Sequence, residues 1–137
     1  MSKYLIAVIL LGHGSIVGAQ SLGSFGGGSS QTVNPSWLNW WPTTFGHSWL
    51  LTSFNLEGTL IDKVFGLLWL ASGICIIAAA LSILGFVVPV TLWRTLAIYG
   101  ASGSLIMLLL YVHPFFLIGI LVDIAILVTL PKWTLIN

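Results

Sequence analysis

The chain has 137 residues, of which 58% are hydrophobic and 5% charged, and its formal net charge is +1. A soluble domain carries about 25% charged residues, so this chain cannot cover itself with a water-compatible surface, and we expect a protein of the lipid bilayer. The near-neutral charge and the lack of a basic cluster exclude a nucleic-acid-binding surface. The single cysteine, Cys75, excludes an internal disulfide and a cysteine-based metal site.

The first predicted element is a short apolar helix over residues 4–19, directly after Lys3. A positive start, a short apolar core and the small residues Val17-Gly18-Ala19 also describe a cleavable secretion signal. Removing the segment would leave three spans and would put Lys132 on the side opposite to that expected for Lys3. We therefore expect it to be retained as a membrane helix.

Residues 20–63 form a different kind of segment, which opens with a glycine- and serine-rich stretch of flexible-linker composition at residues 21–30. Its second part holds four of the tryptophans: Trp37, Trp40, Trp41 and Trp49. Tryptophan favours the membrane–water interface, which predicts a segment lying on the membrane surface, with a short helix at residues 49–56. The alternative is a docking surface for a partner protein or a pigment.

Three more spans are predicted at residues 64–88, 92–112 and 114–130, with Pro89 and Pro114 at their boundaries. Each approaches the roughly 20 apolar residues that a membrane helix needs. The predicted fold is all-α: a single membrane domain, residues 1–137, built as an up-down-up-down bundle of four transmembrane helices with the Trp-rich loop outside.

The distribution of basic residues predicts the orientation of this bundle. Lys3, Arg94 and Lys132 fall on one face of the four-span arrangement, whereas the other face has Lys63 alone, beside Glu57 and Asp62. Because cytoplasmic loops carry an excess of Lys and Arg, we expect both termini in the cytoplasm and residues 20–63 outside the plasma (inner) membrane.

Two ionisable residues are expected inside the bilayer, His13 in the first span and Asp123 in the fourth. Asp123 lies roughly 13 Å from each end of its predicted helix, at 1.5 Å per residue, and His13 lies at a similar depth. A carboxylate at mid-membrane is costly unless it faces a partner, and the first and last helices of such a bundle are usually neighbours. We therefore predict a hydrogen bond between His13 and Asp123, either as an architectural contact or as a proton relay.

Small residues around these groups predict close helix packing. Gly14 and Gly18 in the first span, and Gly100 and Ser104 in the third, have the small-xxx-small spacing that brings membrane helices together. Gly12 and Gly14 also leave room around His13 for a flat macrocycle. The alternative role of His13 is therefore as a ligand to haem or a chlorophyll-type pigment.

Other chemistry is not indicated by the sequence. It has no nucleophile elbow, phosphate loop or Cys-x-x-Cys pair. The histidines are too scattered for a recognisable metal site, since His47 lies in the loop and His113 at a helix boundary where it can stay hydrated. No catalytic residue and no metal site are predicted, and an enzyme is the less favoured reading.

The order of helices resembles the DoxX-like group of small four-helix membrane proteins. The resemblance rests on His-Gly at residues 13–14, on Gly66-Leu67-Leu68-Trp69-Leu70-Ala71 before an alanine-rich helix, and on Gly119-Ile120-Leu121-Val122-Asp123 in the last helix. The loop at residues 21–62 is longer and richer in tryptophan than is expected for that group. The resemblance implies a membrane redox setting, because the name-giving member is associated with quinone-linked thiosulfate oxidation.

Two functional hypotheses follow. The first is a non-catalytic accessory subunit that packs against larger membrane proteins of a respiratory or photosynthetic assembly. The second is a quinone-linked redox protein, or a transporter of protons or small molecules, that uses the His13–Asp123 pair.

Overall fold

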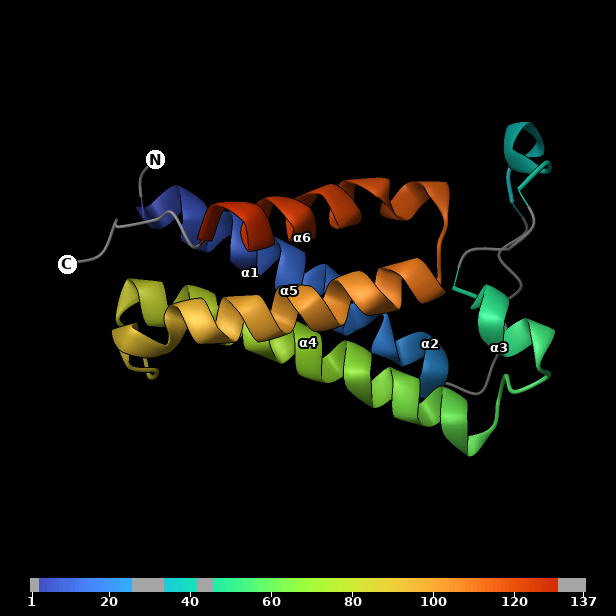
Figure 1. Ribbon diagram of the computed structural model, residues 1–137, viewed down its shortest axis with the longest axis horizontal. Coiled ribbons are helices and arrows are strands. Elements are labelled where there is room, and N and C mark those ends of the chain that lie inside the picture. Colours follow the sequence, from blue (N-terminus) through green and yellow to red (C-terminus); the bar gives the residue numbers. More distant parts are fainter. Residues whose placement is uncertain (1–2, 26–33, 42–45, 131–137) are drawn as a thin grey trace.

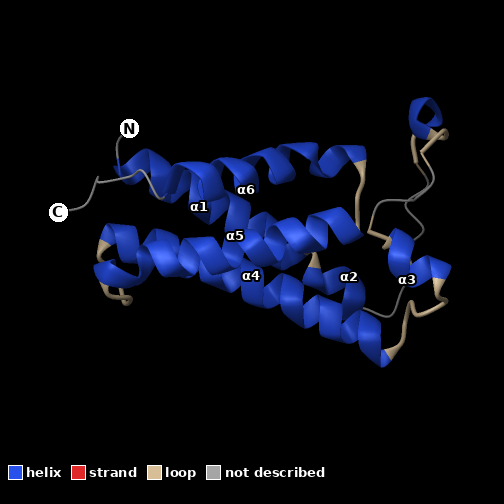
Figure 2. Ribbon diagram, in the orientation of Figure 1, coloured by secondary structure: helices blue, strands red, loops and turns tan. Residues whose placement is uncertain are grey.

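The computed structural model describes residues 3–25, 34–41 and 46–130, and all regular secondary structure in these ranges is helical (Figure 2). Four long helices lie side by side along the longest axis (Figure 1): α1 (Lys3–Ala19), α4 (Leu60–Leu84), α5 (Trp93–Leu110) and α6 (Leu117–Thr129). The shorter elements are α2 (Ser21–Phe25), α3 (Trp49–Ser53) and the 3₁₀ turns η1 (Ser36–Leu38), η2 (Val90–Leu92) and η3 (Pro114–Phe116).

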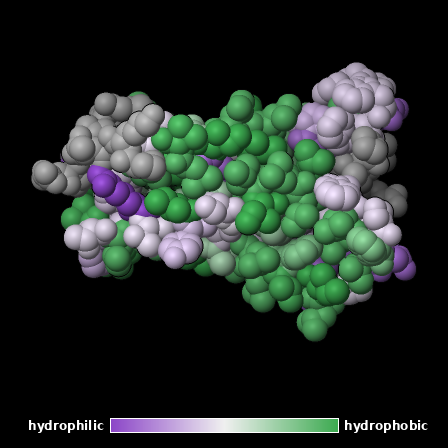
Figure 3. Space-filling model, in the orientation of Figure 1, coloured by the Kyte–Doolittle hydropathy of each residue, from purple (hydrophilic) through white to green (hydrophobic). Residues whose placement is uncertain are grey.

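Three helical stretches of the described ranges are long and apolar enough to cross a membrane: Lys3–Phe25, Leu60–Leu84 and Val90–Leu110. The prediction of an all-helical fold is confirmed for these ranges, and the three apolar helices are of the kind expected in a membrane protein. The fourth apolar stretch, Pro114–Thr129, is shorter; it begins with η3 and continues as α6 over most of the predicted span at residues 114–130. Hydrophobic side chains cover the middle of the face seen in Figure 3.

The predicted boundaries of the second span, residues 64–88, are wrong at both ends. α4 begins at Leu60 because the Thr59 side chain accepts a hydrogen bond from the Ile61 amide as the N-cap. It ends at Leu84 because Gly85 adopts φ +76° and its amide donates to the Ser82 carbonyl, which closes a glycine C-cap. Residues 60–63 therefore belong to a helix, not to the loop.

Two predictions for the loop also need correction. Residues 21–25 are helical (α2) instead of flexible linker, and the Ser21 hydroxyl donates to the Gly18 carbonyl at 2.7 Å. The rest of the predicted linker, residues 26–30, lies outside the described residues, as does Lys132. The short helix predicted at residues 49–56 ends earlier, at Ser53, and Asn55 with φ 55° turns the chain toward α4.

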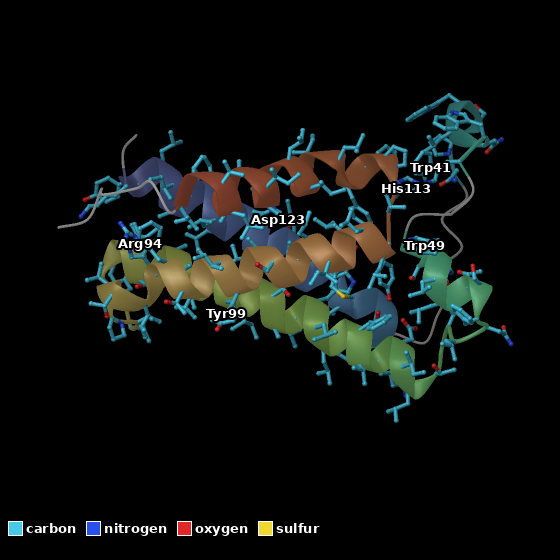
Figure 4. All side chains as sticks on the ribbon, viewed as in Figure 1. Trp41, Trp49, Arg94, Tyr99, His113 and Asp123 are labelled. Carbon is cyan, nitrogen blue, oxygen red and sulfur yellow. The ribbon has the colours of Figure 1, made fainter. Side chains whose placement is uncertain are left out.

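The predicted third span, residues 92–112, corresponds to η2 and α5, which ends at Leu110. At the other end of the chain, Pro114 starts η3, and α6 follows without a break. The starts of α1 and α5 and the end of α6 share one end of the bundle with Arg94, which we call the Arg94 end (Figures 1 and 4). The opposite end, where α3 lies, is called the tryptophan end.

α4 is the central helix, because it packs along both α1 and α5. A Cβ atom on Gly73 would lie 2.6 Å from the Gly18 Cα and 2.8 Å from the Gly14 carbonyl oxygen, so α1 and α4 touch backbone to backbone. On the other side of α4, a Cβ atom on Gly100 would lie 3.0 Å from the Ser72 carbonyl oxygen. The predicted packing glycines therefore lie at helix contacts, and Gly73 is the partner that the sequence did not single out.

Candidate functional site

The structure brings the two predicted intramembrane groups together. His13 Nε2, on α1, lies 2.7 Å from Asp123 Oδ1, on α6. A carboxylate only accepts hydrogen bonds, so the ring N–H donates to it. Asp123 is fully buried and His13 is 9% exposed, which places the contact in the interior, midway between the two ends (Figure 4).

Gly119 lies one turn before Asp123, and its lack of a side chain leaves the space in which His13 and Asp123 meet. A Cβ atom at Gly119 would lie 3.3 Å from the Leu108 Cδ1 and 3.7 Å from the His13 Cε1. A larger side chain would therefore occupy the space into which α5 and α1 project. The signal in the sequence was a glycine four residues before the buried carboxylate, on the same helical face.

Two buried oxygen atoms of the described residues have no hydrogen-bond partner: the second carboxylate oxygen of Asp123 and the hydroxyl of Ser104. α5 and α6 are antiparallel, and Leu108 contacts the Gly119 position. One turn from this contact toward the Arg94 end, Ser104 on α5 lies level with Asp123 on α6. The predicted packing residue Ser104 thus belongs to the same layer as the His13–Asp123 pair.

The contact between α1 and α6 differs from the other helix contacts. α1 packs closely on α4, α4 on α5, and α5 on α6, whereas close backbone approaches between α1 and α6 are few among the described residues. On the Arg94 side of the pair, an apolar cavity of about 280 Å³ lies between α1, α5 and α6. The pair therefore joins two helices that elsewhere leave a space between them.

A second arrangement holds the Trp-rich segment on the end of α5. Trp49 Nε1 donates to the Leu109 carbonyl at 3.0 Å, Ser48 Oγ to the Leu110 carbonyl at 2.9 Å, and Trp41 Nε1 to the Val112 carbonyl at 3.3 Å. The last carbonyls of a helix have no partner within the helix, so Trp49 and Ser48 satisfy two of them, and Trp41 bonds a carbonyl two residues beyond α5. We call these three donors the tryptophan cap.

The remaining predicted tryptophans face outward. Trp37 and Trp40 are 63% and 71% exposed. Trp37 packs its ring edge-on against Phe115 at 6.2 Å between centroids, and Trp40 contacts Trp41 at 5.3 Å. The two exposed rings therefore pack against η3 and against the tryptophan cap.

The sequence suggested that His113 stays hydrated at a helix boundary. In the structure its side chain is buried instead, with the residue 1% exposed. Its Nδ1 accepts from the Phe115 amide at 3.3 Å as the cap of η3, and its Nε2 donates to Asn34 Oδ1 at 3.2 Å. Burial lowers the pKa of His113 below its ordinary value of 6.5. The neutral imidazole is the form that fits both contacts.

Carboxylates gather near the same end. The Tyr111 hydroxyl donates to Asp62 Oδ1 at 3.3 Å, and burial raises the pKa of Tyr111. Glu57 lies 3.1 Å from His47 Nδ1 and accepts from the Thr52 hydroxyl at 2.7 Å. Apart from buried Asp123, these are all the acidic side chains of the chain, so acidic groups outside the core lie only at the tryptophan end.

The described residues contain no group of three His, Cys, Asp or Glu side chains that could hold a metal ion. His13 has its Nε2 engaged with Asp123, and Gly12 beside it borders open space. No family model, curated protein or solved structure matches this chain.

Proposed function

We propose that the chain is a non-catalytic integral membrane protein with four spans, which acts as an accessory subunit of a larger membrane redox assembly. In this proposal both termini are cytoplasmic and the tryptophan end faces outward. The placement of Arg94 at the end shared by the start of α1 and the end of α6 is consistent with that orientation.

The observation that carries the proposal is the fixed presentation of Trp37 and Trp40. Large exposed aromatic side chains are enriched in protein–protein interfaces, and fixing them in advance lowers the entropy lost on binding. Here the tryptophan cap fixes the backbone on which Trp40 sits, and Phe115 supports Trp37. An anchoring role at the lipid surface alone would not require such fixation.

The His13–Asp123 pair supports a structural role in the core. It joins α1 to α6 across the loosely packed side of the bundle, and both groups find their main partner in each other. Interhelical hydrogen bonds in membranes specify packing in this way.

The test is a site-specific crosslink in native membranes. A photoreactive amino acid at position 37 or 40 should capture one defined membrane protein in stoichiometric yield. The same group at Leu67, an exposed position on α4, is the matched control. An absorption spectrum and subunit composition of the gently solubilised complex then test the redox setting. Crosslinks to lipid alone, or equal capture from position 67, would contradict the proposal.

A second candidate function is favoured by one observation, the unpartnered Oδ2 of Asp123, the residue that follows Val122 of the apolar cavity wall. It is a quinone-linked redox or proton-transfer role for the pair. Asp123→Asn keeps an oxygen acceptor for His13 but removes the ionisable group. Loss of activity in an assembly of unchanged subunit composition would support this second function over the accessory one.

A further inference from the structure

The cavity between α1, α5 and α6 lies in the half of the bundle toward the Arg94 end. Its buried walls are Ile6 and Leu10 from α1, Trp93 and Ala97 from α5, Ile126 from α6, and Leu130 directly after α6. The lining has a single side-chain hydroxyl, Thr129, and this donates to the Ala125 carbonyl at 2.6 Å. An occupant of this cavity must therefore be apolar.

The cavity opens to the outside of the bundle between α1 and α6. Ile9 and Ala125, which belong to its lining, are exposed, and α1 and α6 are the neighbours with few close backbone approaches. In a bilayer this opening faces lipid. The cavity volume, about 280 Å³, is well above the roughly 150 Å³ that holds a benzene ring, so it can take part of a hydrocarbon chain.

Charge at the Arg94 end of the bundle favours one class of amphiphile. Lys3, one turn before Ile6, and Arg94, directly after Trp93, are both exposed at this end. Glu57 and Asp62 lie at the tryptophan end, and Asp123 is buried in its pair. Lys3 and Arg94 make this end of the bundle attractive to a negatively charged headgroup, and the acidic side chains of the described residues lie elsewhere.

We propose that this cavity binds one acyl chain of an anionic phospholipid, whose phosphate lies beside Lys3 and Arg94. The chain enters between α1 and α6 and extends inward as far as Leu10 and Val122, the lining residues nearest in sequence to the His13–Asp123 pair. The lipid completes the side of the bundle that the helices leave open. This inference relies on the proposed membrane location but not on the accessory role.

The first measurement is lipid binding to the purified, otherwise unmodified chain by native mass spectrometry. Phosphatidylglycerol and phosphatidylcholine with identical acyl chains are titrated in detergent. We expect one saturable phosphatidylglycerol site that binds more tightly than phosphatidylcholine. Arg94→Gln should weaken phosphatidylglycerol binding about fivefold, the loss of one surface cation, and weaken phosphatidylcholine binding less, because the choline cation offsets the charge of its phosphate.

Ala125→Phe should abolish saturable binding, because a ring at this exposed position fills the mouth. Ala71→Phe is the matched control, since Ala71 is an exposed alanine on α4 outside the cavity, and it should bind lipid as the parent does. Phosphatidylglycerol with brominated chains should quench a saturable part of the tryptophan fluorescence, and Trp93→Phe should remove that part. These variants keep the remaining tryptophans in place.

Equal affinity for the two lipids would overturn the assignment of an anionic occupant. Saturable quenching that persists in Trp93→Phe, or binding that survives Ala125→Phe, would place the lipid elsewhere. A concentration-dependent dimer that only Ala125→Phe disrupts would identify a second copy of the chain as the occupant instead. Insertion of the protein into vesicles is measured before any lipid is titrated. Failure to insert would contradict the proposed membrane location itself.

Discussion

The two sides of α1 are held in different ways. Toward α4, Gly14 and Gly18 meet Gly73 with backbone against backbone, and the contact needs the absence of side chains. Toward α6, close backbone approaches are few, and the contact depends on one hydrogen bond between His13 and Asp123. In a membrane, where lipid is as apolar as the helices, close packing and polar contacts are the two available forces. This chain uses one on each side of the same helix.

The largest effect is expected from breaking the glycine contact. Gly73→Ala places a Cβ atom against the Gly18 backbone, which cannot move without shifting α1, and should cost about 2–3 kcal/mol, as overpacking does. The measurement is the free energy of unfolding in mixed micelles, titrated with a denaturing detergent.

Gly12→Ala is the matched control, because a Cβ atom at Gly12 meets nothing within 4 Å. It should stabilise the helix by about 1 kcal/mol, the propensity difference between glycine and alanine. Equal effects of the two substitutions would show that helix propensity, not the close crossing, governs both positions.

The next effect comes from the other side of α1. Asp123→Leu removes the partner of His13 and should destabilise the protein by about 1–2 kcal/mol, the upper range for an interhelical hydrogen bond in membranes. Asp123→Asn, which can still accept from His13, should retain most of that stability in the same detergent titration. A loss as large for Asn as for Leu would mean that the carboxylate charge is what matters.

A smaller effect is expected at the tryptophan cap. Trp49→Phe keeps an aromatic ring but removes the N–H that donates to the Leu109 carbonyl, and should cost about 1 kcal/mol, the net worth of one hydrogen bond. Limited proteolysis of the Trp-rich segment should accelerate accordingly. The control is Trp37→Phe. The exposed Trp37 ring does not bond a carbonyl at the end of α5 as Trp49 does, so the proteolysis rate should stay unchanged.

The smallest effect is a pH dependence carried by His113. Its folded pKa is below the ordinary value of 6.5, so between these values the unfolded chain binds more protons than the folded one. Its contribution to stability is therefore complete above pH 6.5 and falls as the pH drops through that range. His113→Asn should flatten the stability profile between pH 7 and 5; an unchanged slope would assign the dependence to another group.

The depth of the buried pair could be predicted from the sequence, because matched distances from the helix ends and simple bundle topology sufficed to bring His13 to Asp123. Helix boundaries were harder to predict: the apolar stretch suggested a start at residue 64, whereas Thr59 caps α4 about one turn earlier. The sequence also placed the small residues on helices, but not the face on which Gly73 meets α1.

The tryptophan cap could not be predicted, because it pairs side chains with backbone carbonyls 60 to 71 positions away in the chain. Nothing local in the sequence sets that register. The same holds for His113, whose partner Asn34 comes from the loop. Composition indicated an interfacial role for the tryptophans, and only the fold separates those that cap α5 from those that face outward.

The most direct test of the difference between the two sides of α1 is a pair of distance distributions in lipid. Spin labels at exposed Ile16 and Leu121 report the α1–α6 distance, and labels at Ile16 and Ile74 report the α1–α4 distance, with Cys75 replaced by alanine. The account predicts that replacing His13 and Asp123 together with leucine broadens the α1–α6 distribution and leaves the α1–α4 distribution unchanged. An α1–α6 distribution that stays as narrow as in the parent would contradict it.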